Sequence, residues 1–370
     1  FRNFRISNYQ LMEELIDCCR TLNTSEILSL PDVTERIEVY KLDNSKMQVE
    51  LLNLGAIIRS IKIRDCNGVM RDVVLGYDDL EQYRENPCFF GAVVGPIANR
   101  TSKAKFYIDG QEYRMVPNEG VNNLHSDFEK GIHKSFFSVE SGVCNNVIQM
   151  VLNRKDMEDG FPGNREIKVT YSLSDSNELS IEYAIKSDKK TAIGLTNHSY
   201  FNIGGHDSGS VLGQTLKLKC SYMTPVEDDL IPTGDLRDVK DSPFDFVDGR
   251  KISNNLNLFE KDKQIEIAGG LDHNFVRDDG YGTYAPTAWL FDSKTGIELE
   301  MSTDLPGVQV YAGSNITKGI GKENVTYDKF SGICLETQFF PNSLNEEAFV
   351  KPVIEAGKIF NSKTSYKFIV

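Results

Sequence analysis

The sequence predicts an all-β protein, with one large antiparallel β-sandwich domain preceded by a short helical extension. Three observations support this fold class. Apolar residues alternate with polar ones at a period of two through much of the chain after residue 35. Turn sequences of the kind that close β-hairpins recur between these segments. Strands do not alternate regularly with helical segments, which disfavours a parallel α/β fold.

The N-terminal residues are expected to form the helical extension. Ser7 to Gln10 fits a capping box, in which two polar side chains satisfy free amides at a helix start. Apolar residues then follow at helical spacing from Leu11 to Cys19. We therefore predict the extension at residues 1–33 and the β-sandwich domain at residues 34–370.

The strands are best defined where the alternation is strict. It is strict between Met47 and Leu51, and again between Ile167 and Leu173. After a turn at Asp175-Ser176-Asn177 it resumes from Leu179 to Tyr183. Because successive side chains of a strand point to opposite faces, this pattern predicts strands with one buried face.

Hairpin turns are predicted at three positions. Asn67-Gly68 and Asp109-Gly110 are dipeptides that favour two-residue hairpin loops. A third turn, at residues 293–296, separates two apolar segments. Beyond residue 35 we expect little helix, apart from a short one near residues 78–84. Many short strands joined by hairpins, without a low-complexity linker, favour one large sandwich.

The charge balance limits the possible partners. The chain has 41 Lys and Arg against 54 Asp and Glu, a formal net charge of −13. Nucleic acids and anionic membranes bind basic faces, so we expect neither as a partner. No segment approaches the roughly 20 apolar residues of a membrane span, and no secretory signal pattern is found. A cytoplasmic location is expected.

The cysteines point in the same direction. Seven are spread along the chain without any CxxC pair. An odd number at irregular spacing favours free thiols in a reducing compartment over a disulfide framework. The spacing also differs from that of zinc sites, so no metal is predicted.

His198 is the first candidate for chemistry. It lies in the strand-like segment Leu195 to Gly205, which is rich in hydrogen-bonding side chains and ends in two glycines. An imidazole titrates near neutrality and is the side chain most often used as a general acid or base. A hydrogen-bonded structural histidine at a strand end is the alternative.

Glu336 is the second candidate. It is a carboxylate within the apolar segment Gly332 to Phe340. A charge buried there must be paired, hydrogen-bonded or functional. Gln338 points to the same face of the strand and is expected to help keep the carboxylate ionised. A buried salt bridge and a catalytic carboxylate both fit these residues.

Other polar residues lie where a ligand could be held. Asn99 and Arg100 follow an apolar run, and Gln309 lies in a short apolar strand. His125 occupies an Asn-rich loop, and Asp272 follows two glycines that allow close approach to a ligand. Amides and a single guanidinium suit a polyhydroxylated ligand. A solvated loop histidine and an Asx-turn are the alternatives for His125 and Asp272.

His133 and His206 lack comparable surroundings and are expected to be surface or structural residues. Several other chemistries lack support, because no dinucleotide-binding, phosphate-loop, nucleophile-elbow or HExxH motif is present. No cofactor is therefore predicted. Asp272 and Glu336 could flank a glycosidic bond, which keeps glycoside hydrolysis open.

Taken in order, eight segments resemble one family. They are Asn53 to Ala56, Asp72 to Tyr77, Gly95 to Arg100, Asn123 to His125, Asn197 to Asn202, Gly270 to His273, Pro306 to Gln309 and Leu335 to Gln338. Across about residues 38 to 369 the chain resembles the aldose 1-epimerases, also called galactose mutarotases.

The resemblance implies a β-supersandwich fold, no cofactor, and interconversion of the α and β anomers of aldohexoses such as galactose and glucose. It implies that Glu336 is the general base and His198 the general acid. The residues that the resemblance places around the sugar are Asn99, Arg100, His125, Asp272 and Gln309, with Tyr200 lining the same pocket.

The chain departs from the family pattern at the pocket rim. His125-Ser126-Asp127 stands where the family commonly has His-Gly-Gly, and Pro96 replaces a residue that is often Arg. These changes bear on sugar preference more than on chemistry. A non-catalytic sugar-binding or regulatory protein and a hexose-6-phosphate 1-epimerase are the alternative functions. A monomer is expected, with a dimer as the alternative.

Overall fold

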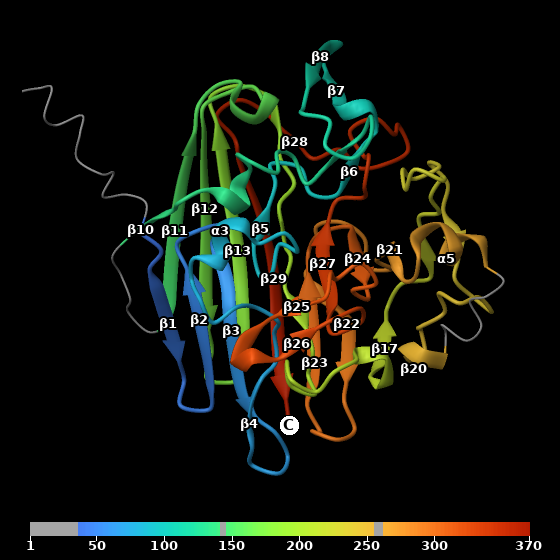
Figure 1. The fold of residues 1–370 in the computed structure, drawn as a ribbon. Coiled ribbons are helices and arrows are strands. Elements are labelled where there is room, and N and C mark those ends of the chain that lie inside the picture. The colour runs from blue at the N-terminus through green and yellow to red at the C-terminus, as the bar shows by residue number, and fades with distance from the viewer. Residues whose placement is uncertain (1–35, 141–145, 255–261) are drawn as a thin grey trace, which may run out of the picture. The chain divides into compact units, whose positions relative to one another are not determined.

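The computed structural model describes residues 36–140, 146–254 and 262–370. The predicted helical extension at residues 1–33 lies outside the described residues. Residues Ile37–Val370 form one compact unit. All pairings between the named strands of this unit are antiparallel, which confirms the predicted fold class (Figure 1).

Three larger sheets make up most of the unit. The four-stranded sheet has the order β1 (Val39–Asp43), β2 (Met47–Leu52), β3 (Ile57–Arg64) and β4 (Met70–Asp72). The nine-stranded sheet has the order β10 (Ser138–Glu140), β11 (Val147–Arg154), β12 (Arg165–Leu173), β13 (Glu178–Ser187), β29 (Ile359–Ile369), β23 (Glu298–Thr303), β22 (Ala285–Phe291), β17 (Thr215–Leu218) and β20 (Arg250–Lys251). The six-stranded sheet has the order β16 (Tyr200–Phe201), β27 (Ile333–Gln338), β24 (Gly307–Tyr311), β21 (Asp272–Val276), β18 (Tyr222–Met223) and β19 (Arg237–Asp238).

Short elements connect and cover these sheets. The two-stranded pairs are β5 (Val93–Val94) with β15 (Thr196–Asn197), β6 (Arg100–Thr101) with β9 (Asn123–Leu124), β7 (Lys105–Ile108) with β8 (Gln111–Arg114), β14 (Thr191–Ala192) with β28 (Val353–Ile354), and β25 (Gly319–Ile320) with β26 (Thr326–Tyr327). The helical elements include α3 (Gln82–Glu85), α5 (Lys263–Ala268) and the 3-10 turns η2 (Ser102–Ala104), η3 (Ile132–Lys134), η4 (Glu158–Gly160), η5 (Val211–Gly213) and η7 (Lys322–Asn324). The predicted hairpin turns lie between β3 and β4, β7 and β8, and β22 and β23, as expected.

The long strands follow the predicted alternation. On β12 the residues at every second position from Ile167 to Leu173 are buried, and on β13 the same holds from Leu179 to Ile185. In Figure 1, β29 runs between β13 and β23, and thus joins the two halves of the nine-stranded sheet. The alternation of buried and more exposed residues along these strands therefore produces one apolar sheet face, on which the rest of the unit packs.

The nine-stranded sheet backs both smaller sheets. The hydroxyl of Tyr171 on β12 donates to the carbonyl of Ala56, next to the four-stranded sheet. The hydroxyl of Tyr366 on β29 donates to the carbonyl of Leu335 on β27. A single apolar core contains side chains from all three sheets. This layered arrangement leaves the second face of the six-stranded sheet available for a site.

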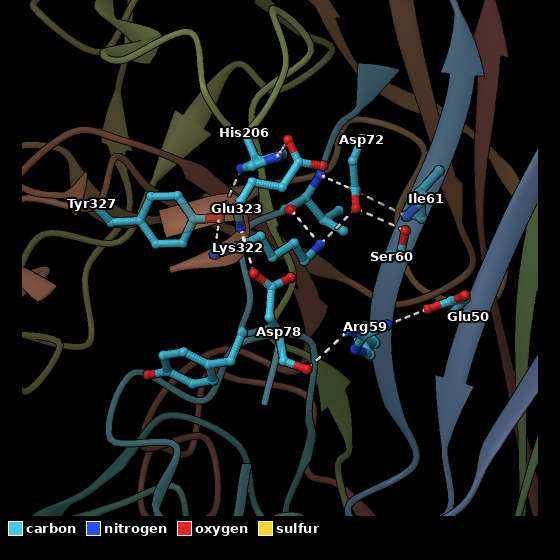
Figure 2. A network of polar contacts seen from close by, with 12 residues as sticks. Glu50, Arg59, Ser60, Ile61, Asp72, Asp78, His206, Lys322, Glu323 and Tyr327 are labelled. Carbon is cyan, nitrogen blue, oxygen red and sulfur yellow. Dashed lines mark hydrogen bonds and ion pairs between the residues drawn. The ribbon is translucent and has the colours of Figure 1, made fainter. Parts of the chain in front are cut away.

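A buried polar network fixes the connection after β4. Figure 2 shows Lys322 and Asp72 side by side, with Nζ of Lys322 2.8 Å from Oδ2 of Asp72. The same Nζ donates to the carbonyl of Val74. The backbone amide of Leu75, next in the chain, donates to the carbonyl of Tyr200 on β16. The network therefore holds the segment that pairs with the edge of the six-stranded sheet.

His206 and His133 are both buried. In Figure 2 His206 lies beside Tyr327, whose hydroxyl is 3.0 Å from Nδ1 of the imidazole. The His133 ring packs against Phe89 and its Nε2 lies 3.2 Å from the carbonyl oxygen of Phe128. Both histidines are therefore structural, and the alternative of a surface position was wrong because each ring fills an aromatic contact.

Candidate active site

A cavity of about 220 Å³ opens on the outer face of the six-stranded sheet. All the residues expected from the sequence to form the site line this cavity: Asn99, Arg100, His125, His198, Tyr200, Asp272, Gln309 and Glu336. They come from segments far apart in the chain, so the fold alone brings them together. Their individual roles remain predictions.

Three of these side chains share one face of the sheet because of strand register. Gln309 on β24 lies directly opposite Glu336 on β27. On the other side Gln309 lies opposite Asn274 of β21, and Asp272 is two residues before Asn274, so it points the same way. Nε2 of Gln309 donates to Oδ1 of Asp272 at 2.7 Å. The sheet thus presents two carboxylates and an amide from a rigid platform.

His198 approaches this platform from the edge. Its backbone amide donates to the carbonyl of Ala92 and its carbonyl accepts from Gly91. Its Nε2 lies 3.7 Å from Oε1 of Glu336, and its Nδ1 lies 3.6 Å from Sγ of Cys334. Both the imidazole and the carboxylate are almost completely buried. The second carboxylate oxygen of Glu336, Oε2, is buried without a hydrogen-bond partner among the described residues.

An unpartnered buried carboxylate oxygen is costly, because desolvation is not repaid by a hydrogen bond. The Glu336 residue that carries it lines a cavity together with amides, an arginine and histidines. Such an atom is suited to accept a proton or hydrogen bond from a hydroxyl of a bound molecule.

His125 and Asn99 face each other across the β6–β9 pair. The backbone amide of Asn99 donates to Nδ1 of His125 at 3.1 Å. A neutral imidazole that accepts at Nδ1 carries its proton on Nε2. His125 therefore offers an N–H donor rather than a lone pair. The side-chain Nδ2 of Asn99 in turn lies 3.4 Å from Oε1 of Gln338.

The unusual residue after His125 fits its backbone conformation. Ser126 has a φ of 69°, in the left-handed region that favours glycine. Its hydroxyl accepts from the amide of Ile97 and donates to the carbonyl of the same residue. These two bonds offset the strain of the left-handed conformation at Ser126, and His125 lies on the cavity wall.

Aromatic rings close one side of the cavity. The ring of Phe89 lies 5.1 Å from that of His125 and 5.7 Å from that of His198, centre to centre. Tyr200 lies 5.1 Å from His198 on the other side. These contacts exclude water from the imidazoles and fix their orientation.

Burial sets the proton affinity of the main pair. It lowers the pKa of His198 to about 4. It raises the pKa of Glu336 well above its ordinary value, and the nearby Asp272 carboxylate raises it further while Arg100 lowers it. Without a ligand, burial therefore favours the uncharged pair. The expected support from Gln338 was wrong, because its amide is directed to Oε1 of Gln309 at 3.5 Å.

The neighbouring groups respond to the same burial. The pKa of His125 is lowered well below its usual value, mainly by desolvation, so this ring is neutral at pH 7. The pKa of Asp272 is raised by burial, and the Arg100 charge opposes this rise.

A metal ion is a second conceivable occupant. Ligand atoms of His125, His198 and Glu336 lie within 4.8 Å of one another. However, Nδ1 of His125 already accepts the Asn99 amide, and the other nitrogen carries the proton in that tautomer. Binding a metal would require this hydrogen bond to break, so the donor set fits a polyhydroxylated molecule better than a cation.

Sequence reasoning missed some residues of the cavity. Tyr311 also lines the wall, and its position two residues after Gln309 on one strand could have indicated this. Glu119 lines the cavity too, and it forms a bidentate ion pair with Arg100. Nothing in the local sequence Asn118-Glu119-Gly120 distinguishes it from an ordinary turn carboxylate.

A larger groove of about 780 Å³ lies at the ends of β11, β12 and β13. It is open to solvent and lined by charged residues such as Arg154 and Asp188. Arg154 is paired with Glu158, and Asp188 accepts from both amides of Asn164. These two charged groups are thus paired within the protein.

In the described part of the chain, no helix has the length and apolar character needed to cross a membrane. The cysteines described there, Cys66, Cys88, Cys220 and Cys334, are all free thiols.

Comparison with known proteins agrees with this architecture. A curated galactose mutarotase from Bos taurus is 33% identical over 342 residues, covering 92% of this chain and 96% of the relative. An aldose 1-epimerase from Escherichia coli K12 is 30% identical over 332 residues, covering 88% and 93% respectively.

Solved structures show the same fold. The crystal structure of an aldose epimerase homologue from C. elegans superposes with a TM-score of 0.81 at 26% identity, covering 90% of this chain and 99% of that one. A galactose 1-epimerase from Lactobacillus acidophilus superposes at 0.79 with 24% identity, covering 92% and 96%. The family model for aldose 1-epimerase matches residues 38–367. The chain therefore belongs to the aldose 1-epimerase family.

Proposed function

We propose that this protein interconverts the α and β anomers of aldohexoses, with Glu336 and His198 as its acid–base pair. The observation that carries the proposal is the buried pair itself, with Nε2 and Oε1 3.7 Å apart and Oε2 of Glu336 unpartnered in a cavity. Anomer exchange requires one group that removes a proton from the C1 hydroxyl and another that protonates the ring oxygen.

The reaction follows from this requirement. The carboxylate of Glu336 takes the proton of the C1 hydroxyl while protonated His198 gives one to O5. The C1–O5 bond breaks, its electron pair stays on O5, and C1 becomes an aldehyde carbon. Rotation about C1–C2 presents the other face of the aldehyde. O5 then attacks C1, His198 takes back the proton of the O5 hydroxyl, and Glu336 returns its proton to the former aldehyde oxygen.

The pKa shifts of Glu336 and His198 favour the ring-opening step of this cycle. The ionised pair and the neutral pair hold the same number of protons and differ only in where one proton lies. Burial raises the pKa of Glu336 and lowers that of His198, which favours the neutral pair. The neutral pair is the form produced when the ring opens, so burial assists ring opening. Hydroxyls of the bound sugar offset the cost of the ionised form.

The other side chains suit the sugar's hydroxyls. Asn99 and His125 provide N–H donors, and the Gln309–Asp272 pair provides an amide beside an acceptor. Arg100 adds a charged donor from the rim. We assign binding and orientation of the sugar to these residues, with Tyr200 as an apolar wall. Orientation and exclusion of water add to the acid–base effect.

The alternatives have less support. The homologues do not favour a non-catalytic sugar-binding protein or a hexose-6-phosphate epimerase. For glycoside hydrolysis, two carboxylates should flank the bond from either side. Asp272 and Glu336 instead project from the same face of one sheet.

We also propose that the protein works as a cytoplasmic monomer. Four free cysteines suit a reducing compartment, and a net charge of −13 discourages casual self-association.

The test is polarimetric decay of fresh α-D-galactose and α-D-glucose with and without the protein. We expect the protein to accelerate the approach to equilibrium for at least one sugar. Folded protein that binds either sugar without accelerating its decay would identify a binding protein instead.

A further inference from the structure

Arg100 and Glu119 form a bidentate ion pair at the cavity. Nε of Arg100 donates to Oε2 of Glu119 at 2.7 Å, and one terminal nitrogen donates to Oε1 at 2.9 Å. Both residues line the cavity. The Arg100 side chain is only 9% exposed, whereas that of Glu119 is 35% exposed. Glu119 is thus the solvent-side partner of a guanidinium that reaches into the cavity wall.

This pairing occupies the part of Arg100 best suited to an anion. Parallel N–H groups of a guanidinium match the oxygens of a carboxylate or phosphate, and this match makes arginine the usual residue for binding such groups. With Glu119 in place, one edge of the guanidinium is already engaged by a carboxylate of the protein itself. A phosphate on a sugar would have to displace it.

The net charge of the cavity lining also disfavours the binding of an anionic sugar. Outside the Glu336–His198 pair, its described lining contains two carboxylates, those of Glu119 and Asp272, and one guanidinium. The histidines do not balance this, because burial lowers the pKa of both His125 and His198. Arg100 feels both acidic neighbours. The cavity therefore has an excess of acidic groups once Arg100 has been paired.

We propose that Glu119 makes the cavity selective for uncharged aldoses by engaging Arg100 and by repelling sugars that carry a carboxylate or phosphate. This inference rests on the proposed epimerase activity and assigns to it a class of substrate. Specificity of this kind comes as much from rejection of the wrong ligand as from attraction of the right one.

The Glu119→Gln variant tests this role. Glutamine keeps the size of the side chain and one acceptor oxygen, but it removes the negative charge and weakens the hold on Arg100. The matched control is Glu112→Gln, on the nearby β8 strand, which removes a carboxylate paired with Lys105 and Arg114 outside the cavity. The two variants have the same net charge. A difference between them therefore reports the effect of removing a charge at the cavity, and not the effect of the change in net charge of the protein.

The readout is kcat/KM for anomer exchange of D-galactose and of D-galacturonate, measured by NMR exchange against protein-free blanks. We expect Glu119→Gln to raise the galacturonate-to-galactose ratio of kcat/KM by about 10-fold or more, with galactose activity reduced less than 10-fold. Glucose and glucose 6-phosphate should show the same trend. In Glu112→Gln the ratio should stay within about 2-fold of wild type.

A measurement on the unmodified protein guards against a variant that does not fold. Raising the salt concentration screens charges, so galacturonate exchange by wild type should increase relative to galactose. The proposal is overturned by an unchanged ratio in folded Glu119→Gln, or by a wild-type ratio that does not respond to salt. Wild type that fails to accelerate galactose exchange would instead contradict the proposed function.

Discussion

Nε2 of His198 lies 3.7 Å from Oε1 of Glu336 because two independent backbone constraints converge. The backbone of His198 is hydrogen-bonded to residues 91 and 92, and Glu336 sits in the middle of β27 between β16 and β24. The side chains therefore face each other without a flexible loop on either side. Rigid support of this kind is what acid–base catalysis requires, since proton transfer depends steeply on distance.

Replacing Asp272 with Asn should move the alkaline limb of the kcat/KM profile to lower pH. Burial raises the pKa of Glu336, and the negative charge of Asp272 raises it further. Removing that charge makes Glu336 easier to ionise, so the pair of Glu336 and neutral His198 loses its one remaining proton at lower pH. We expect a displacement of about one pH unit, measured as the pH profile of galactose exchange.

Asp272→Asn should also raise KM, because an amide oxygen accepts the hydrogen bond of Gln309 more weakly than a carboxylate does. The Glu112→Gln variant is the control for a change in net charge and should leave the alkaline limb in place. An alkaline limb that does not move, or that moves to higher pH, in Asp272→Asn would contradict the coupling.

Replacing Lys322 with Met should destabilise the fold. The Lys322 and Asp72 side chains are 5% and 7% exposed, so the substitution leaves a buried carboxylate without its cation. Breaking one partner of such a pair typically costs about 3–5 kcal/mol. Urea unfolding measures this loss as a shift of the midpoint.

The double variant Lys322→Met with Asp72→Asn should recover part of that stability, since no unpaired charge remains. The control is Lys41→Met: Lys41 pairs with Glu50 but is 70% exposed, so its loss should cost less than about 1 kcal/mol. Equal effects of the Lys322 and Lys41 substitutions would show that the buried network in Figure 2 contributes no more than a surface pair.

Stability should fall as the pH drops from about 6.5 toward 4, in part because of His133. Burial lowers its pKa to about 4, below the value of about 6.5 in an unfolded chain. In that pH window the unfolded chain binds a proton that the folded protein does not, so protonation favours unfolding. The contribution of this group is complete above pH 6.5 and disappears at the lower end of the window.

Urea unfolding at several pH values checks this, with His133→Gln beside wild type. Glutamine does not titrate, so the variant should lose less stability between pH 6.5 and 4, by at most about 3 kcal/mol. Parallel stability curves for the two proteins would show that His133 does not titrate differently on folding.

Much of the fold and of the site could be predicted because it depends on short sequence patterns. The alternation from Ile167 to Tyr183 predicted β12 and β13, and the Asn67-Gly68 turn predicted a hairpin. The cavity residues were identified because polar groups in apolar segments, such as Glu336, are costly without a purpose. Their grouping around one sugar came from the resemblance to a family.

Other features depend on contacts that no local pattern encodes. Glu119 lies in a turn of ordinary composition, and only the tertiary fold sets it against Arg100. Likewise Gln338 shares a face with Glu336, but its amide is directed to Gln309 because the neighbouring strand offers an acceptor. His206 lies in a segment rich in glycine and polar residues, which did not indicate burial, yet its ring is buried against Tyr327, more than a hundred residues away.

The most direct test of the account is the rate of galactose anomer exchange in the Glu336→Gln and His198→Asn variants, with sugar affinity measured alongside. Both substitutions preserve approximate size while removing the group that accepts or donates the proton. We expect kcat to fall by roughly 10²- to 10⁴-fold in each, with galactose affinity within a few-fold of wild type. A folded variant of either kind that retains kcat within about 3-fold of wild type would contradict the assignment of this pair.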